Sequence, residues 1–273
     1  MKIHKVTNVE QFVAKMIPKQ AQKNKTIVET IIKNVQKNGD SSVKKYEKKF
    51  TGAAISNLRV SKSEIKNAYS KVSKNEITAL KLSKNKVEKT ESVIKNIFKN
   101  KKINQDGIKI LKKFIPIQST GCYIPGGLAR YPSSVIMSVI PAKVAGVKRI
   151  VVVSPPNSNG KIDPLTIVAA DICGATEIYK TGGVQAIAAL SFGTKSISKV
   201  DKIVGPGGAF VTLAKSSVSD NTGIDMLAGP TELGIIADNS ANPEYIALDL
   251  ISQAEHSSDT FCYLITNSER TSK

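Results

Sequence analysis

The sequence predicts an α/β protein with a doubly wound parallel sheet, joined to a second, incomplete α/β domain that has a helical, lysine-rich N-terminal region. One observation is the continuous β-branched run Ile150–Val153, which is typical of a strand buried on both faces of a parallel sheet. A second is that strand-like runs, glycine turns and helix-like runs alternate at short spacing after it. A third is the helical periodicity of the lysine-rich segment before it.

The positive charge of the chain is confined to its first part. The 273 residues have a formal net charge of +18; residues 1–113 contain 28 Lys and Arg against 9 Asp and Glu, and residues 114–273 contain 12 against 13. Lysines at helix-surface spacing, with few arginines or aromatic residues among them, are typical of a solvated face. We therefore expect no nucleic-acid site, although binding of a polyanion by residues 1–113 remains an alternative.

The composition predicts a globular protein of the cytoplasm. Hydrophobic residues make up 41% of the chain, enough for a sizeable core. No apolar run approaches the roughly 18 residues that a membrane span needs, so we expect no membrane partner. The three cysteines, Cys122, Cys173 and Cys262, are too far apart to indicate a disulfide framework or a thiolate zinc site.

The segment from Met1 to about Lys113 is predicted to be mostly helical, with its last helix running from Lys74 to about Lys99. The first clear apolar stripe has i, i+3, i+4 and i+7 spacing and consists of Val28, Ile31, Ile32 and Val35. Ser63 is predicted to be the N-cap of a later helix. Ser73, with Glu76 three residues on, predicts a capping box for the next helix. This third of the chain shows no catalytic constellation.

The alternating pattern begins after the apolar run Phe114–Ile117, which we predict leads as a strand into the loop G-C-Y-I-P-G-G at Gly121–Gly127. A helix-like run, Ser133–Ala145, follows the loop. Further strands are predicted at Lys148–Ser154, Glu177–Lys180 and Asp201–Val204, and further helices at Pro164–Cys173, Val184–Leu190 and Ala209–Val218.

The glycine-containing turns share one polarity. Gly121–Gly127, Gly182-Gly183 and Gly205–Gly208 each follow a predicted strand and precede a predicted helix. Such turns gather at the carboxyl edge of a parallel sheet, where open α/β proteins bind ligands. None of them matches G-x-G-x-x-G, and the chain has no P-loop, so tight turns without a ligand remain the alternative.

The last part of the chain predicts two strands, at Met226–Gly229 and Leu233–Ala237, then a helix that starts at Asn242-Pro243, and a final strand near residues 260–266. Gln253 and His256 are spaced i, i+3 and share one face of this helix. A histidine and a glutamine oxygen can both bind Zn²⁺, but an isolated pair of this kind is more often a capping or core pair.

Taken in order, these segments resemble the histidinol dehydrogenase family. The matching motifs are G-C-Y-I-P-G-G, P-A-K-V-A-G-V at Pro141–Val147, S-P-P at Ser154–Pro156, G-G-V-Q-A-I-A-A-L-S-F-G-T at Gly182–Thr194, V-D-K-I-V-G-P-G at Val200–Gly207, A-F-V-T at Ala209–Thr212, I-D-M-L-A-G-P-T-E at Ile224–Glu232 and S-Q-A-E-H at Ser252–His256. They cover roughly residues 110–262, and the helical N-terminal third lacks a sharp motif.

The resemblance implies oxidation of L-histidinol through the aldehyde to L-histidine, with two NAD⁺ and a bound Zn²⁺. It implies a Rossmann-like NAD-binding domain at residues 123–228. Residues 1–122 would be the helical N-terminal part of the other α/β domain, and residues 229–273 would continue that domain. Tyr123 and Gln185 would contact NAD. Gly208 stands where the family usually has an NAD-contacting Asn, so we expect weaker or altered NAD binding.

The resemblance also implies a metal and substrate site. Thr231 falls where the family uses Ser or Thr to contact substrate, and Gln253 and His256 match two residues of the zinc and substrate site. The family's catalytic Glu-His pair and its two further zinc ligands have no counterpart in residues 1–273, so no catalytic residue is assigned.

The chain is therefore expected to be a C-terminally truncated member, inactive by itself, from a family of cytoplasmic homodimers. A truncated paralogue that binds nucleotide without turnover is the main alternative.

Overall fold

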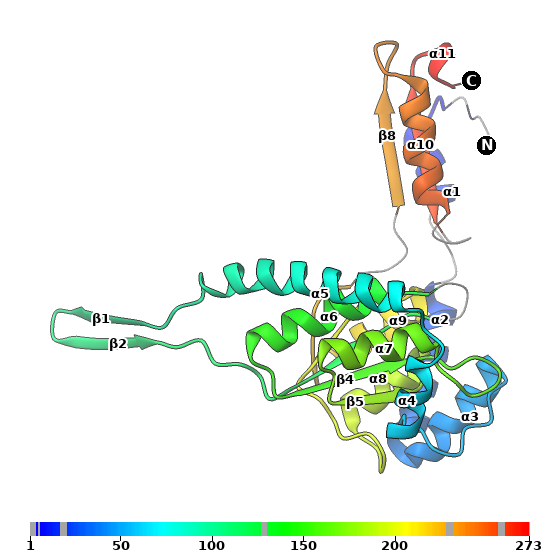
Figure 1. Ribbon diagram of the computed structural model, residues 1–273. Helices are drawn as coiled ribbons and strands as arrows, with labels where there is room; N and C mark the ends of the chain where they lie inside the picture. Colours follow the sequence, from blue (N-terminus) through cyan, green and yellow to red (C-terminus); the bar gives the residue numbers. More distant parts are fainter. Residues whose placement is uncertain are drawn as a thin grey trace. The chain divides into compact units, whose positions relative to one another are not determined.

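A five-stranded parallel sheet forms the centre of residues 26–227 (Figure 1). Its strands are β3 (Ser119–Tyr123), β4 (Arg149–Ser154), β5 (Glu177–Lys180), β6 (Lys202–Val204) and β7 (Gly223–Ile224). Their spatial order is β5-β4-β3-β6-β7, so the chain builds outward from β3 to β5 and then returns to place β6 on the other side of β3. This reversal is the switch point at which open α/β sheets bind ligands. The predicted α/β class with a parallel sheet is confirmed.

Helices cover both faces of this sheet. The helices on one face are α4 (Lys62–Tyr69), α5 (Lys74–Lys95), α6 (Pro132–Ala145) and α7 (Pro164–Cys173), and those on the other are α2 (Ala21–Asn38), α3 (Asp40–Thr51), α8 (Gly183–Phe192) and α9 (Ala209–Val218). Along β4, Ile150 and Val152 enter the first core, and Val151 and Val153 enter the second. Successive side chains of a strand point to opposite faces, which explains why this run is apolar throughout.

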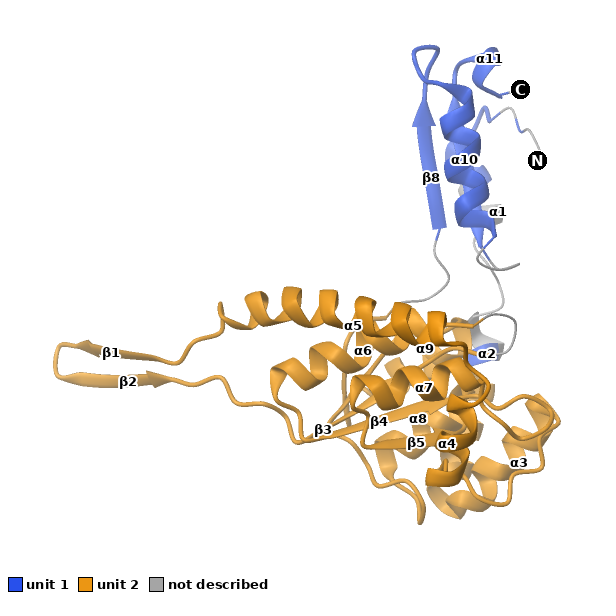
Figure 2. Ribbon diagram, in the orientation of Figure 1, with its two compact units in different colours: residues 1–25, 228–273 blue, residues 26–227 orange. Residues whose placement is uncertain are grey.

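The computed structural model describes residues 4, 6–16, 21–126, 130–227, 232–255 and 260–272. They belong to two compact units, residues 26–227 and residues 1–25 with 228–273 (Figure 2). The second unit contains α1 (Val9–Met16), β8 (Glu232–Ala237), α10 (Pro243–Ala254), β9 (Phe261–Thr266) and α11 (Glu269–Ser272). Strands β8 and β9 pair in parallel around α10, forming a βαβ unit. In the described parts of the chain, no helix combines the length and apolarity of a membrane span.

The prediction of a mostly helical segment to about Lys113 missed a hairpin at its end. Residues 101–112 form an antiparallel hairpin of β1 (Lys101–Gln105) and β2 (Ile108–Lys112), which projects from the rest of its unit (Figure 1). Asp106 and Gly107 both have positive φ, 47° and 81°. Two such residues are the pattern of a type I′ hairpin turn, and the Asp-Gly dipeptide is the local signal that the helical interpretation missed.

The strand before the glycine loop was also predicted at the wrong residues. Phe114–Ile117 is exposed and lies outside any strand, whereas β3 includes Gly121, Cys122 and Tyr123, which the sequence predicts to be in a loop. Gly121 is suited to this strand because a Cβ there would lie 2.8 Å from the side chain of Leu190. The strand position therefore depends on packing against α8, which local sequence does not reveal.

The predicted helix caps have mixed outcomes. Ser73 and Glu76 form the expected capping box at the start of α5. The N-cap of α4 is Ser61 and not Ser63, because Ser61 Oγ accepts from the N–H of Glu64 at 3.1 Å and Glu64 Oε2 accepts from the N–H of Ser61 at 2.8 Å. In the predicted strand at 226–229, Met226 is not in a strand, and residues 228–229 lie outside the described residues.

Candidate functional site

Three strand-to-helix turns lie at the carboxyl edge of the parallel sheet. They follow β3, β5 and β6, and the pairings of β3 with β4 and β6, and of β4 with β5, are all parallel. Parallel strands bring their carboxyl ends to the same edge. The structure therefore groups Tyr123, the Gly182-Gly183 turn and the Gly205–Gly208 turn, as the sequence pattern predicted. Of the loop Gly121–Gly127, the last residue is outside the described residues.

Tyr123 contacts both of the other turns. Its hydroxyl accepts a hydrogen bond from the backbone N–H of Gly183 at 3.1 Å. Its backbone oxygen lies against Gly205, where a Cβ would approach it to 2.2 Å. Only 6% of Tyr123 is exposed, and burial raises the pKa of its phenol to about 12, so the hydroxyl keeps its proton. The side chain and the backbone oxygen of Tyr123 thus link the two turns beneath the edge.

Gln185 lies in the first part of α8 and is 2% exposed. Its Nε2 donates a 2.8 Å hydrogen bond to Glu47 Oε1, which also accepts from Thr181 Oγ1 at 2.7 Å and from the N–H of Gly182 at 2.8 Å. Burial raises the pKa of Glu47, and these three donors offset this only in part. The β5–α8 turn is therefore held from beneath by a carboxyl group on α3.

Glu47 is a residue of this site that the sequence interpretation missed. It lies next to Tyr46, a member of the buried stripe of α3, and is 0% exposed. The available signal was an acidic residue beside an apolar stripe, but surface glutamates also occur at such places. Its partner Gln185 is 138 residues away, so no local pattern could have paired them.

Gly208 is the exposed member of the predicted set. It is the N-cap of α9, with φ −67°, and a Cβ built on it would meet nothing within 4 Å. Its neighbour Gly207 differs, because a Cβ there would lie 2.4 Å from Val211. The space beside Gly208 is open and lies at the N-terminus of α9, a kind of position that favours anions.

An ion pair between the buried Lys215 and the partly exposed Asp225 holds the β6–α9 turn. Lys215 is 2% exposed, donates to the backbone oxygen of Gly205 at 3.0 Å and forms an ion pair with Asp225. Asp225 also accepts from the N–H of Gly205 at 2.8 Å. Burial alone would raise the pKa of Asp225, but its hydrogen bonds from Lys215, Gly205 and Met226 lower it below its ordinary value.

The predicted metal and substrate residues are only partly described. Thr231 and His256 lie outside the described residues. Gln253, on α10, has a side-chain Nε2 that is buried and has no hydrogen-bond partner among the described residues. Because amide oxygen and nitrogen are assigned by their contacts, this unpartnered end could equally present an oxygen, and an oxygen suits a metal or a donor. Within the described ranges, no group of three or more His, Cys, Asp or Glu gathers as a metal cluster.

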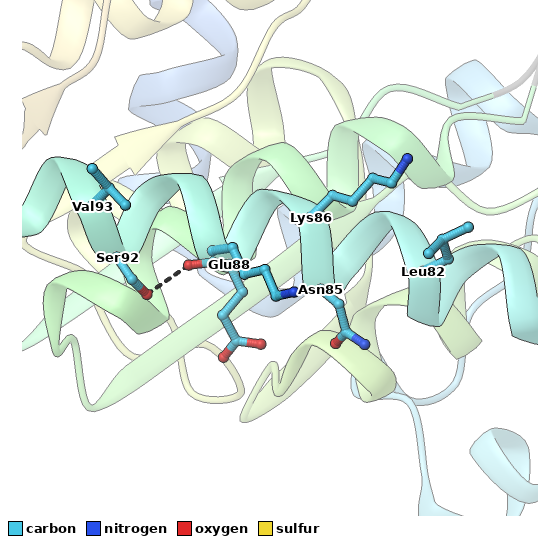
Figure 3. Close-up of a pocket in the computed structure, with 7 residues that line it drawn as sticks. Leu82, Asn85, Lys86, Glu88, Ser92 and Val93 are labelled. Atoms are coloured by element: carbon cyan, nitrogen blue, oxygen red, sulfur yellow. Dashed lines mark hydrogen bonds between the residues drawn. The ribbon is translucent and has the colours of Figure 1, made fainter.

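A hollow of about 710 Å³ lies along α5, and its lining includes no residue of the three turns (Figure 3). Its lining comes from one helix and includes Leu82, Asn85, Glu88 and Val93. The carboxylate of Glu88 is occupied by ion pairs with Lys84 at 3.0 Å and Lys143 at 3.5 Å. Without converging side chains from other elements, this hollow provides no basis for a ligand site.

Comparison with known proteins identifies a family that matches most of this chain. Residues 15–273 match the family model described as Histidinol dehydrogenase. The histidinol dehydrogenase of Clostridium acetobutylicum is 46% identical over 264 residues, which cover 95% of this chain and 61% of that protein. The Methanocaldococcus jannaschii protein of the same name is 45% identical over 245 residues, with 90% and 57% covered.

A solved structure gives the same result. The crystal structure of histidinol dehydrogenase from Elizabethkingia anophelis matches with a TM-score of 0.80 and 37% identity, covering 99% of this chain and 59% of that one. The chain thus spans about three fifths of the length of the relatives it matches.

Proposed function

Because this chain belongs to the histidinol dehydrogenase family, we propose that the protein of which these residues are part oxidises L-histidinol, through the aldehyde, to L-histidine. The proposed cofactors are two NAD⁺ and one Zn²⁺. The observation that carries the proposal is the convergence of three glycine turns on Tyr123 at the switch point of the sheet.

The NAD-binding residues in this proposal are Tyr123, Gln185 and Gly208. A cofactor lying along the carboxyl edge would meet the backbone of the Gly182-Gly183 turn and of Gly208, with Tyr123 and Gln185 directly beneath. The open space beside Gly208 and the helix N-terminus there suit a pyrophosphate. The tight packing of Gly205 and Gly207 suits turns that must stay rigid while a cofactor binds.

Thr231, Gln253 and His256 are the proposed substrate and zinc residues. The unpartnered buried amide of Gln253 is consistent with a ligand role. When bound, Zn²⁺ orients the amino alcohol and polarises its oxygen, while NAD⁺ takes the hydride. In this division of roles, Gln253 and His256 bind and orient, Thr231 contacts the substrate, and the turns around Tyr123 position the nicotinamide. No residue of this chain is assigned to the proton transfers. The proposal therefore names no catalytic residue in this chain.

The test is cofactor binding and NADH formation measured together. We expect residues 1–273 to bind NAD⁺ in a calorimetric titration, and we expect no NADH from L-histidinol, NAD⁺ and Zn²⁺ with this chain alone. NADH formation by residues 1–273 would show that the proton-transfer groups are within this chain. Absence of NAD⁺ binding at millimolar cofactor would overturn the proposal that the carboxyl edge of the sheet binds NAD⁺.

We also propose a cytoplasmic homodimer, as the family resemblance implies. Light scattering of the purified chain gives its mass directly, and a monomer at all concentrations would contradict the dimer for residues 1–273.

A further inference from the structure

Two buried oxygen atoms beside the β5–α8 turn have no hydrogen-bond partner among the residues that the structure describes. They are Glu47 Oε2 and Gln185 Oε1, and the residues that bear them are 0% and 2% exposed. The same two side chains are joined through their other atoms, since Gln185 Nε2 donates to Glu47 Oε1 at 2.8 Å. An unpaired buried acceptor is costly, and two on one bonded pair need a common explanation.

One proton accounts for both atoms. An ionised carboxylate is an acceptor only, so it cannot satisfy the amide oxygen of Gln185. A neutral carboxylic acid has one O–H donor and can pair with a carboxamide through two hydrogen bonds. One of these runs from the amide N–H to the acid's carbonyl oxygen, and that bond is present. The other runs from the acid O–H to the amide oxygen.

The proton belongs on Oε2 because the donors of the site all point at Oε1. Thr181 Oγ1, the N–H of Gly182 and Gln185 Nε2 approach Oε1 at 2.7, 2.8 and 2.8 Å. The groups that act on Glu47 are its burial and these three donors, which are all uncharged. From β3 it is faced by Tyr123, whose phenol is itself protonated.

We propose that Glu47 is a neutral carboxylic acid at neutral pH and that its Oε2–H donates to Gln185 Oε1. The pair makes Glu47 a positioning residue, because it locks the amide of Gln185 and the Gly182-Gly183 turn in one orientation. Its consequence for NAD⁺ rests on the proposed function, whereas the protonation state does not.

The test compares E47Q, E47A and, as a matched control, E64Q. Gln at position 47 supplies an uncharged donor and acceptor in the same shape, so the urea midpoint of E47Q is at least as high as that of the wild type, and E47A lowers it. Glu64 is the control because hydrogen bonds from Lys180 and Ser61 outweigh its burial and lower its pKa, which indicates an ionised carboxylate. E64Q therefore loses stability at neutral pH.

The pH dependence distinguishes the neutral acid from a purely structural role. The folded pKa of Glu47 is raised, so the stability it contributes is full below its ordinary pKa and is lost as the pH rises through the folded value. The wild type therefore loses stability relative to E47Q as the pH rises from the ordinary glutamate pKa towards the folded value. The infrared C=O band of a neutral carboxylic acid is present in the wild type and E64Q at neutral pH and absent in E47Q.

NAD⁺ affinity supplies the last measurement. E47A binds NAD⁺ roughly tenfold more weakly, the size of one lost hydrogen bond, and E47Q restores most of this loss. A wild type without the acid band, together with an E47Q variant that is less stable than the wild type at neutral pH, would overturn the neutral acid. If the band is present and no variant binds NAD⁺, then the proposed function fails and the proton assignment stands.

Discussion

The hydroxyl of Tyr123, at the end of β3, accepts a hydrogen bond from the backbone N–H of Gly183, at the start of α8, at 3.1 Å. The two residues are 60 positions apart in the chain and meet because β3 and β5 end at the same edge of one sheet. The same tyrosine packs its backbone oxygen on Gly205. One side chain and its backbone therefore couple both turns to which we assign cofactor binding.

Replacing Tyr123 with Phe tests this coupling. Y123F removes the acceptor of the Gly183 N–H in a buried place, so we expect a loss of about 1 kcal/mol in the free energy of unfolding and weaker NAD⁺ binding. Urea denaturation and calorimetry measure the two effects. Y69F is the matched control, because the hydroxyl of Tyr69 bonds to Asp171 at 2.7 Å on another surface. If the NAD⁺ affinity falls equally in Y123F and Y69F, the loss in Y123F is not caused by the hydrogen bond between Tyr123 and Gly183.

Gly208→Asn should strengthen NAD⁺ binding. The side chain enters open space at an ordinary φ of −67°, so it causes no clash. As an N-cap it should also stabilise α9 by about a few tenths of a kcal/mol. G208A is the control that adds a Cβ without a polar group. An unchanged Kd for NAD⁺ in G208N would remove position 208 from the proposed contacts.

Gly205→Ala should destabilise the fold strongly. A Cβ at Gly205 would lie 2.2 Å from the backbone oxygen of Tyr123, and φ is +113°, a region that L side chains rarely adopt. We expect a loss of roughly 3 kcal/mol, measured by thermal and urea unfolding. G208A, three positions away in open space, should unfold like the wild type, and equal stability of G205A and G208A would contradict this packing.

The Lys215–Asp225 pair should show coupled energetics. D225N leaves the buried ammonium of Lys215 without its counter-charge, and we expect a loss of about 3 kcal/mol. The double variant K215M/D225N removes both charges, so its loss should be smaller than the sum of the single losses. A double-mutant cycle from urea unfolding measures the difference, and additive losses would show that the two groups act independently.

The Lys215–Asp225 pair also predicts how the free energy of unfolding changes as the pH falls. The folded pKa of Asp225 is lowered, so its contribution is present above its ordinary pKa and is lost as the pH falls through the folded value. The wild type should therefore lose stability relative to D225N on acidification. Parallel acid-unfolding curves for the two proteins would contradict a lowered pKa.

Zinc binding should depend on Gln253 and His256. Each change to Ala should weaken Zn²⁺ retention roughly tenfold or more, since losing a ligand costs at least as much as losing its supporting contacts. Metal content after dialysis against a competing chelator measures this. The chain has two histidines, and His4→Ala is the matched control. Equal losses in H4A and H256A would indicate unspecific binding.

Local sequence was sufficient for most of the parallel sheet. The predicted strand Glu177–Lys180 and the predicted helices Pro164–Cys173 and Ala209–Val218 have the predicted bounds. Strong local signals mark these elements: apolar runs, Pro at a helix start and Gly at a helix end. The capping box at Ser73 belongs to the same class, because its bonds span only three residues.

The errors occur where a segment is stabilised by distant contacts or by one short turn. The strand β3 contains Gly121, a residue that locally favours a turn, and it is a strand because Leu190 fills the space where a Cβ would be. The hairpin at 101–112 depends on two residues of positive φ, Asp106 and Gly107, within a lysine-rich segment that otherwise has the composition of a helix surface. In both places the prediction followed the average composition of the segment and missed the single feature on which the structure depends.

The sequence by itself determined the α/β class, the order of strands and helices around the glycine turns and the family motifs, because each of these is encoded in neighbouring residues. The tertiary structure alone decided that Glu47 holds Gln185 and that Lys215 holds the turn at Gly205. It also decided that Tyr123 and Gln185 are buried while Gly208 is exposed. Such pairings join residues that are distant in the chain or on different elements, and they form only after the sheet order brings the strand ends to one edge.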